Sequence, residues 1–151
     1  MAQTILVTGS TSGFGRLTVE TLARQGHRVF AGMRAIAGKN AAAADELRAL
    51  AERAGQSVHP VEIDVTDDAS VEQAIAAIIA ATGRIDVVVN NAGVSYSGPL
   101  EAFPPEQARQ QFETNVLSVL RVNRAALPHM RQQGSGLLIQ IGSIVGRIAV
   151  P

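Results

Sequence analysis

Three glycines near the amino terminus are the clearest candidates for chemistry. Gly9, Gly13 and Gly15 lie in the segment Thr-Gly-Ser-Thr-Ser-Gly-Phe-Gly, directly after a short apolar run and before a helical pattern. Glycine permits a tight turn and lets a phosphate approach the backbone, while the first N–H groups of the following helix can bind that anion. The segment therefore favours phosphate binding, although a turn in which glycine serves packing alone remains an alternative. No Lys-Ser or Lys-Thr pair follows the last glycine, so it is not a Walker loop.

Polar residues follow three later apolar runs. They are Asp64-Val65-Thr66, Asn90-Asn91-Ala92-Gly93 and Gly142-Ser143. Asn115 lies within a long helical pattern, where Asn is unfavourable by propensity. Each has a plain alternative: Asp64 and Ser143 as turn residues, Asn90 and Asn91 as loop residues, and Asn115 as a satisfied or solvent-facing amide.

Short apolar runs alternate with helical patterns along the chain. The predicted strands are residues 4–8, 28–32, 57–63, 85–89 and 137–141, and the predicted helices are residues 13–25, 41–54, a segment after Asp67 and Asp68, and 105 to about 133. This order predicts an α/β fold, with a doubly wound parallel sheet between two layers of helices. Ligands bind beyond the carboxyl ends of such strands, at the switch in strand order. The loops expected to matter are residues 8–15, 32–40, 64–67, 90–104 and 142–151.

Two prolines refine this prediction. Pro60 cannot donate a ladder hydrogen bond, so its strand is expected at an edge of the sheet. Pro128 is expected to kink the last helix or to end it early. The apolar stripe of that helix is expected to comprise Phe112, Val116, Val119 and Leu120.

The composition is that of one folded domain, residues 1–151. Hydrophobic residues make up 46% of the chain and aromatic residues 3%, so the core is expected to consist of Ala, Val, Ile and Leu. Thirteen basic residues balance thirteen acidic ones, which gives no long-range field favouring nucleic acid or an acidic membrane. There is no cysteine, and His27, His59 and His129 show no metal-binding spacing, so no metal site is expected. No membrane span or signal-peptide core is recognisable, and a soluble, cytoplasmic protein is expected.

The glycine spacing and the later motifs together resemble the short-chain dehydrogenase/reductase family. Gly9-x3-Gly13-x-Gly15 is followed in order by the Asp64, Asn90, Asn115 and Ser143 motifs, across the whole chain. This glycine spacing combined with Asn-Asn-Ala-Gly is specific, whereas either piece alone is weaker. The resemblance implies a Rossmann fold, truncated here after its fifth strand, and an NAD(P)-dependent oxidoreductase.

The resemblance also implies roles for individual residues. The three glycines would form the turn under the pyrophosphate, and Asp64 and Val65 would bracket the adenine. Asn90 and Gly93 would line the path toward the ribose and nicotinamide. Asn115 would hold a water of the proton relay, and Ser143 would donate a hydrogen bond to the substrate oxygen. Ser10, Ser12, Phe14, Arg34 and Ala92 complete the expected cofactor-binding set.

The end of the second predicted strand bears on the choice of cofactor. An acidic residue there would bind the ribose hydroxyls and repel a 2′-phosphate. This chain instead has Met33 followed by Arg34, whose planar guanidinium suits a phosphate. We therefore expect NADP(H) in preference to NAD(H), although Arg34 could also be an ordinary surface residue.

The family's catalytic machinery further includes a Tyr-x-x-x-Lys segment after the serine, in which Tyr exchanges the proton and Lys lowers its pKa. The chain stops at Pro151, eight residues after Ser143, and its only Tyr and Lys, Tyr96 and Lys39, lack that spacing. Tyr96 is interpreted as a loop or substrate-pocket residue. We expect the amino-terminal part of a larger enzyme, catalytically inactive by itself.

The expected function is thus hydride transfer between NADP(H) and a small-molecule carbonyl or secondary alcohol. One alternative is a nucleotide-binding regulatory module without catalysis, and another is a relative of nucleotide-sugar epimerases or dehydratases. The resemblance implies a homo-oligomer, a dimer or tetramer, formed through the long helix near residues 105–130. An isolated chain that exposes the edge of its fifth strand is expected to self-associate.

Overall fold

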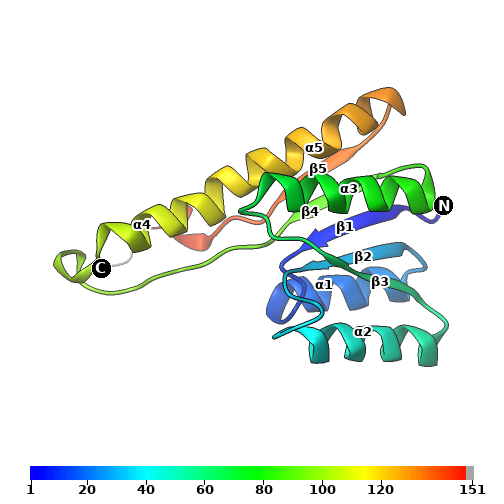
Figure 1. Ribbon diagram of the computed structural model, residues 1–151, viewed down its shortest axis with the longest axis horizontal. Coiled ribbons are helices and arrows are strands. Elements are labelled where there is room, and N and C mark those ends of the chain that lie inside the picture. Colours follow the sequence, from blue (N-terminus) through cyan, green and yellow to red (C-terminus); the bar gives the residue numbers. More distant parts are fainter. Residues whose placement is uncertain (149–151) are drawn as a thin grey trace.

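Five short strands rich in Val, Ile and Leu form one parallel sheet in the computed structural model, which describes residues 1–148 (Figure 1). The strands are β1 (Thr4–Thr8), β2 (Arg28–Met33), β3 (Ser57–Glu62), β4 (Val87–Asn90) and β5 (Leu137–Gln140). Their order in the sheet is β3-β2-β1-β4-β5. The direction of strand addition therefore reverses between β1 and β4, and the predicted doubly wound sheet is confirmed.

Helices cover both faces of this sheet. The covering helices are α1 (Gly13–Arg24), α2 (Ala41–Ala54), α3 (Asp68–Thr82) and α5 (Ser118–Gln132), whereas α4 (Pro105–Phe112) precedes α5 along the chain and buries none of its residues. In Figure 1, α1 and α2 lie on one side of the strands, while α3 and α5 lie on the other. These are the three α/β/α layers that the strand–helix alternation predicts.

The alternation of side chains along β1 divides the core into two layers. Ile5 and Val7 pack with Val19 of α1 and Leu47 of α2, whereas Leu6 packs on the opposite face with residues of α3 and α5. Because both faces of each central strand are covered, the strands are apolar throughout rather than alternately apolar and polar. This explains why they stand out in the sequence as continuous apolar runs.

Pro60 lies at the position that its chemistry requires. It belongs to β3, which is an edge strand, and pairs in register with Ala31 of β2. The missing N–H of proline therefore interrupts no ladder between two neighbours. The prediction of an edge strand is confirmed.

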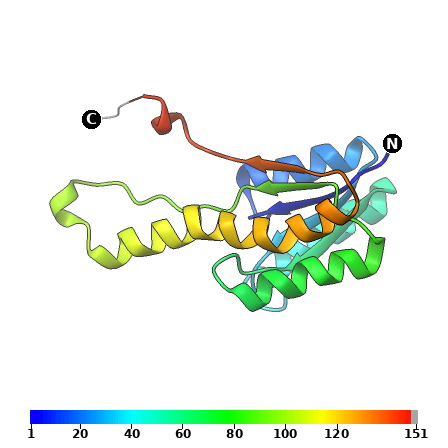
Figure 2. The same ribbon diagram turned by 90° about the horizontal axis from the view of Figure 1, so that it is seen from above.

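The long helix differs from its prediction in two respects. It runs from α4 through a π-helical segment, η2 (Glu113–Leu117), into α5, and Pro128 lies inside α5 without ending it. The predicted apolar stripe also does not pack on the sheet, because Phe112, Val116 and Leu120 are exposed. The residues of α5 that pack toward the sheet are Ser118, Val122, Ala126 and Met130. The helix reaches beyond the end of the sheet, where the sheet cannot cover its stripe (Figure 2).

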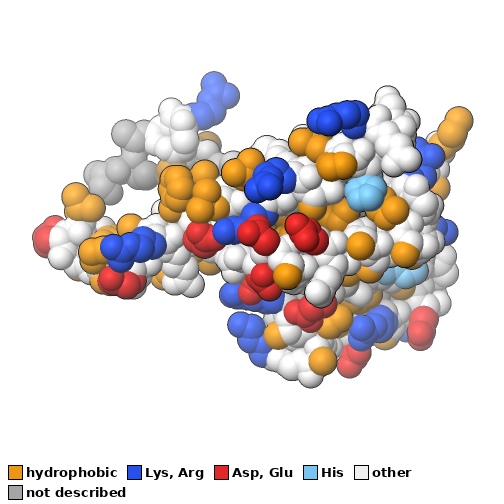
Figure 3. All heavy atoms as spheres, turned by 45° about the horizontal axis from the view of Figure 1, so that its top comes forward, with side chains coloured by type: hydrophobic (Ala, Val, Ile, Leu, Met, Phe, Trp, Pro, Cys, Tyr) orange, Lys and Arg blue, Asp and Glu red, His pale blue; other side chains and the backbone are white. Residues whose placement is uncertain are grey.

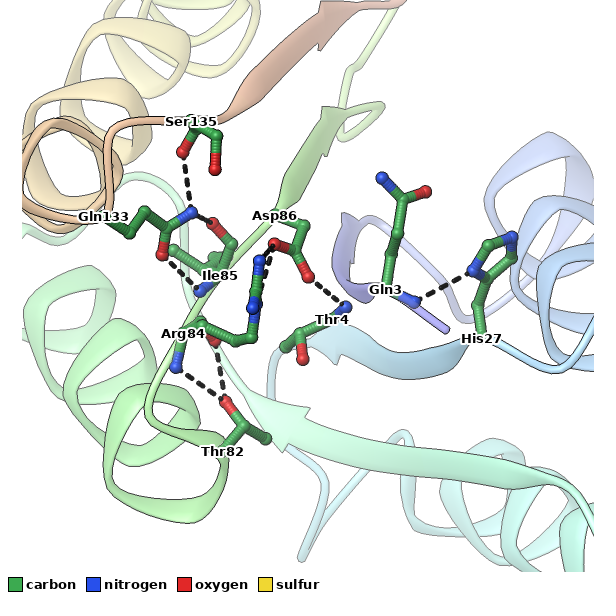
Figure 4. A network of polar contacts seen from close by, with 9 residues as sticks. All are labelled: Gln3, Thr4, His27, Thr82, Arg84, Ile85, Asp86, Gln133 and Ser135. Carbon is green, nitrogen blue, oxygen red and sulfur yellow. Dashed lines mark hydrogen bonds and ion pairs between the residues drawn. The ribbon is translucent and has the colours of Figure 1, made fainter. Parts of the chain in front are cut away.

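A polar network joins three strands at their amino ends (Figure 4). The carboxylate of Asp86 accepts a hydrogen bond from the backbone N–H of Thr4 at 2.8 Å and another from Nε of Arg84 at 2.9 Å. Gln133 Nε2 donates to the carbonyls of Ile85 and Ser135, at 2.7 Å each. The starts of β1, β4 and β5 are thereby connected.

In residues 1–148, no helix has the length and apolarity needed to cross a bilayer.

Candidate functional site

A cavity of about 400 Å³ opens beyond the carboxyl ends of β1 to β4. Four of the five predicted loops contribute to its walls, and α4 and η2 contribute Gln110 and Thr114. The loop after β5 adds no lining residue within the described part of the chain, and residues 149–151 lie outside that part. The predicted residues that line the cavity are Gly9, Ser12, Phe14, Gly15, Arg34, Asp64, Val65, Ala92 and Gly93.

Packing requires two of the three glycines in the first loop. A Cβ atom on Gly15 would lie 2.2 Å from the carbonyl oxygen of Gly9, and one on Gly9 would lie 2.8 Å from Cα of Ala92. Gly13 is different, because a Cβ there would meet no described atom within 4 Å, while its φ of +56° favours glycine. The packing interpretation therefore explains Gly9 and Gly15, whereas Gly13 is glycine for its backbone conformation.

The first turn of α1 has free hydrogen-bonding capacity. Ser12 occupies the N-cap position but makes no capping side-chain hydrogen bond within the described residues, and the first turn contains no acidic residue. The first N–H groups of a helix lack intrahelical acceptors, and they carry the positive end of the helix dipole. This helix end, open to the cavity, can bind an anion.

Ser10 has a structural role in this loop. Its side chain is buried and donates a hydrogen bond to the carbonyl oxygen of Val7 at 2.7 Å, while its backbone N–H donates to Gly32 at 3.0 Å. Ser10 is not one of the described residues that line the cavity. It attaches the glycine segment to the ends of β1 and β2.

Thr8 and Asn91 join the loops after β1 and β4. The hydroxyl of Thr8 accepts hydrogen bonds from the backbone N–H groups of Asn91 and Ala92, both at 3.0 Å. In return, Nδ2 of Asn91 donates to the carbonyl oxygens of Thr8 at 2.9 Å and Gly9 at 3.2 Å. The switch point of the sheet is therefore a closed hydrogen-bonded joint. Asn91 also lines the cavity.

The two other asparagines are engaged elsewhere. Asn90 is buried, and its Nδ2 donates to Oδ1 of Asn123 in α5 at 2.9 Å, so it is not a lining residue in the described structure. Asn115, in η2, binds the backbone of Val94 at both ends of its amide. Its Oδ1 accepts from the Val94 N–H at 2.9 Å, and its Nδ2 donates to the Val94 carbonyl at 2.8 Å. Asn115 thus attaches the loop after β4 to the long helix.

Hydrogen bonds and nearby positive charges favour the ionised form of Asp64. Its Oδ1 accepts from the hydroxyl of Thr66 at 2.6 Å and from the Thr66 N–H at 2.9 Å. Burial raises the pKa of Asp64, but the hydrogen bonds from Thr66 and the charges of Arg34 and Lys39 together lower it below its ordinary value. Arg34 and Lys39 both line the cavity, whose rim at β2 and β3 therefore carries two cations beside one carboxylate.

Ser143 and Tyr96 lie outside the described cavity walls. Ser143 is exposed after β5, and its Oγ accepts a hydrogen bond from the Val145 N–H at 3.3 Å. The hydroxyl of Tyr96 donates to Oε1 of Gln110 at 2.6 Å, and Gln110 is a lining residue. Tyr96 is thus a loop residue at the margin of the cavity, as its position in the sequence indicates.

Some lining residues were not identified from the sequence as site residues. They are Thr11, Met33, Lys39, Asn40, Ile63, Thr66, Asn91, Val94, Gln110 and Thr114. Most lie beside predicted site residues, so their position at a strand end was an available signal. Gln110 and Thr114 come from the long helix, and no motif marks them.

Comparisons with known proteins show which family this chain is similar to. The family model described as short chain dehydrogenase matches residues 3–151. Among curated relatives, 3-ketodihydrosphingosine reductase of Bacteroides thetaiotaomicron is 38% identical, over 99% of this chain and 50% of that protein. The 3-oxoacyl-(acyl-carrier-protein) reductase of Escherichia coli is 34% identical, over 93% of this chain and 54% of that protein. The chain spans about half the length of the curated relatives it matches.

Two solved structures of dehydrogenases also match this chain. A gluconate 5-dehydrogenase from Burkholderia cenocepacia, in complex with NADP and tartrate, matches with a TM-score of 0.87 and 32% identity, over 99% of this chain and 56% of that one. A short-chain dehydrogenase from Streptomyces avermitilis matches with a TM-score of 0.85 and 34% identity, over 99% of this chain and 52% of that one. The predicted family resemblance is confirmed.

Proposed function

The chain belongs to the short-chain dehydrogenase family, and from this premise we propose that its cavity binds NADP(H) for hydride transfer to or from a carbonyl or secondary alcohol. The family is one of oxidoreductases, and the relatives named above are reductases or dehydrogenases. Because the chain spans about half of their length, substrate and activity belong to the proposal for the whole protein.

The open glycine loop at the start of α1 is the observation that carries the proposal. Gly9 and Gly15 bring the backbone close to the loop after β4, and the positive φ of Gly13 turns the chain into the first turn of the helix. A pyrophosphate fits this arrangement, since the helix end supplies N–H donors and no carboxylate stands in its first turn within the described residues. Gly9, Ser12, Gly13 and Gly15 would hold the pyrophosphate.

The loops after β2 and β3 support a phosphorylated adenosine ribose. Arg34 and Lys39 line the cavity, and Met33 stands where an acidic residue would repel a 2′-phosphate. Asp64 lies nearby. Burial raises its pKa, but the hydrogen bonds from Thr66 and then the charges of Arg34 and Lys39 lower it below the ordinary value. Its carboxylate oxygens can accept from the adenine amino group, with Val65 beside them. The gluconate 5-dehydrogenase noted above was solved with NADP.

The bound nicotinamide would supply the hydride donor or acceptor. In this chain, Ser143 has an exposed hydroxyl whose oxygen accepts from the Val145 N–H, which leaves its hydrogen to donate to a substrate oxygen. Asn115 Oδ1 accepts one hydrogen bond from Val94 and has a second lone pair for a water of a proton relay. Gly93 and Ala92 would line the path between the ribose and the reacting carbon.

Calorimetric titration of the purified chain with NADP and NAD tests the proposed cofactor. We expect tighter binding of NADP, and in Arg34→Asp we expect NADP binding to weaken by about tenfold or more, with the preference turned toward NAD. The matched control is Arg131→Asp, the same change at an exposed position near the end of α5, which should alter neither affinity. A preference unchanged by Arg34→Asp would contradict the assignment of Arg34, and no binding of either cofactor would contradict the proposed function.

A further inference from the structure

The segment between β2 and α2 is held by a carboxylate from the neighbouring edge strand. Glu62, the last residue of β3, binds two successive backbone N–H groups. Its Oε1 accepts from Ala35 at 2.6 Å, and its Oε2 accepts from Ile36 at 2.8 Å. Hydrogen bonds to an ionised acceptor are the stronger kind, and this pair fixes the backbone direction at two consecutive residues.

Ala35 has a backbone conformation that alanine rarely adopts. Its φ is +52°, and among the described residues it is the only one other than glycine with a positive φ. Such a conformation is unfavourable for an L-residue with a Cβ atom, so something must stabilise it. Successive N–H groups at a turn of this kind form a concave anion-binding site, and here the protein's own Glu62 occupies that site.

The same segment carries the two cations of the cavity. Arg34 precedes the turn and Lys39 follows it, and both line the cavity. The turn is closed by Asn40, whose Nδ2 donates to the carbonyl oxygen of Arg34 at 2.5 Å and whose N–H donates to that of Ala35 at 3.1 Å. The backbone at Ala35 therefore determines where Arg34 and Lys39 stand relative to each other.

We propose that Glu62 is a positioning residue for phosphate recognition: by holding the Ala35–Ile36 turn, it keeps Arg34 and Lys39 together at the cavity rim, where they would bind the 2′-phosphate of NADP(H). The inference rests on the proposed function. Glu62 is not one of the described residues that line the cavity, and each of its carboxylate oxygens is engaged with a backbone N–H. It acts through the segment and does not contact the nucleotide.

The direction in which phosphate affinity changes when Glu62 is removed distinguishes a positioning role from a direct electrostatic one. A carboxylate near a phosphate repels it, so Coulomb's law alone predicts that removing Glu62 strengthens phosphate binding. Positioning predicts the opposite, since the turn relaxes when its anchor is lost and the two cations no longer converge. The probes are adenosine 2′,5′-bisphosphate and adenosine 5′-monophosphate, which differ only in the 2′-phosphate.

The experiment is calorimetric titration of the 151-residue chain with both probes. In Glu62→Ala we expect bisphosphate affinity to fall by about tenfold while monophosphate affinity is unchanged. The matched control, Glu52→Ala, removes an exposed carboxylate of α2 that makes no hydrogen bond or ion pair in the described structure, and should change neither. Unchanged or increased bisphosphate affinity in Glu62→Ala would overturn the inference.

A second variant tests the mechanism by rescue. Glycine adopts positive φ without the steric penalty of alanine, so Ala35→Gly in the Glu62→Ala background should restore part of the lost bisphosphate affinity. Absence of any rescue would show that Glu62 does not act through this turn. Amide hydrogen exchange should also accelerate at Ala35 and Ile36 in Glu62→Ala, and unchanged exchange would overturn the anchoring itself.

The same titrations would give a different result if the proposed function itself were wrong. If the wild-type chain bound both probes with equal affinity, NADP(H) recognition by Arg34 and Lys39 would be wrong, and so would the ligand assigned to Glu62. Hydrogen exchange would still decide whether Glu62 holds the turn. A wild-type preference for the bisphosphate that survives in Glu62→Ala leaves the proposed function standing and overturns this inference alone.

Discussion

At the level of single residues, Gly13 allows ligand binding to be tested separately from packing as the reason for glycine in this loop. Gly9 and Gly15 are surrounded by backbone, so their substitution would disturb packing whether or not a ligand binds. Gly13 has positive φ and open space around it. Its substitution therefore tests ligand binding with little interference from packing.

We predict that Gly13→Ala weakens NADP binding by at least tenfold while lowering the free energy of unfolding by about 1–2 kcal/mol, the cost of a left-handed alanine. Gly55→Ala is the matched control, because Gly55 has a φ of +61° and equally open surroundings at the end of α2, away from the cavity. It should cause a similar loss of stability with no change in binding. Titration calorimetry and urea unfolding measure the two quantities, and equal effects on binding in both variants would contradict a role of Gly13 in nucleotide binding.

Asp86 makes the stability of the protein depend on pH. Burial raises its pKa, but the hydrogen bonds from the Arg84 side chain and the Thr4 N–H lower it by more, so the net pKa lies below the ordinary value. A carboxyl group with a lowered native pKa contributes stability above the pKa of the unfolded chain, about 3.9, and loses it as pH falls through the native value. Asp86 should therefore stabilise the fold at neutral pH and cease to do so in acid.

We predict that Asp86→Asn lowers the free energy of unfolding at pH 7 by about 1–2 kcal/mol, because a neutral amide cannot replace the carboxylate that accepts from the Thr4 N–H and from two nitrogens of Arg84. The difference from wild type should shrink as the pH falls below about 4. Asp45→Asn serves as the control, since the Asp45–Arg48 ion pair is exposed on α2 and contributes little. Urea unfolding at several pH values measures this, and a difference that persists at low pH would contradict the assignment.

Strand-end positions in the sequence indicated several of the residues that line the cavity, but they did not indicate which way each side chain points. Arg34 and Asp64 line the cavity because they follow strands whose carboxyl ends share one edge. Ser10 and Asn90 occupy equally suggestive positions, but their side chains turn into the protein toward Val7 and Asn123. A one-dimensional pattern contains no information on that choice, which depends on which acceptor lies within reach after folding.

At the scale of elements, the joint between β1 and β4 positions the glycine loop. Thr8 is almost fully buried, and its one hydroxyl accepts from two N–H groups of the loop after β4. Valine has nearly the same shape but no acceptor, so it would leave both N–H groups without their partner. The two strands would remain paired, and the loops beyond them would separate.

We predict that Thr8→Val lowers the free energy of unfolding by about 1–3 kcal/mol. It should also weaken nucleotide binding, because Gly9 and Ala92 lose their common support. Thr21→Val, on the exposed face of α1, should change neither property appreciably. Full nucleotide affinity in Thr8→Val would mean that the glycine loop keeps its shape without this joint.

The elements that pack on the sheet were predictable from sequence, and the helix that extends beyond it was not. Predicted bounds for β1 and α2 agree with the structure, because β1 is a continuous apolar run buried on both faces and α2 buries a clear apolar face. Periodicity gives the apolar stripe of the α4–α5 helix correctly as a pattern, but it cannot say whether anything covers that stripe. Phe112, Val116 and Leu120 lie where the helix has left the sheet.

At the scale of the whole molecule, two exposed apolar surfaces are the candidate contacts between copies of the chain. The helix surface comprises Phe112, Val116 and Leu120, and the strand surface comprises Leu137, Ile139 and Ile141, all of them exposed. Figure 3 shows hydrophobic side chains among charged ones on the face of the molecule that it presents. The formal net charge is +0, so little long-range repulsion opposes association.

The strand surface should be the stronger site of self-association. β5 pairs with β4 on one side only in the described sheet, so it offers free backbone groups as well as apolar side chains. Leu137 and Ile139 pair in register with Val87 and Val89, whose side chains pack in the α1–α2 core layer. A second copy aligned along β5 could extend both the hydrogen bonding and this apolar layer, whereas the helix surface offers side-chain contacts alone.

We predict that Leu137→Lys lowers the concentration-dependent association of the purified chain more than Leu120→Lys does. The two leucines are a matched pair, because they are exposed to 53% and 55% and the substitution is the same. Lysine on an edge strand opposes edge-to-edge pairing, while lysine on the helix surface removes only apolar contact area. Sedimentation velocity over a range of concentrations measures the effect. A larger effect of Leu120→Lys would instead make the helix surface the contact between copies, as the resemblance to the family implies for the region near residues 105–130.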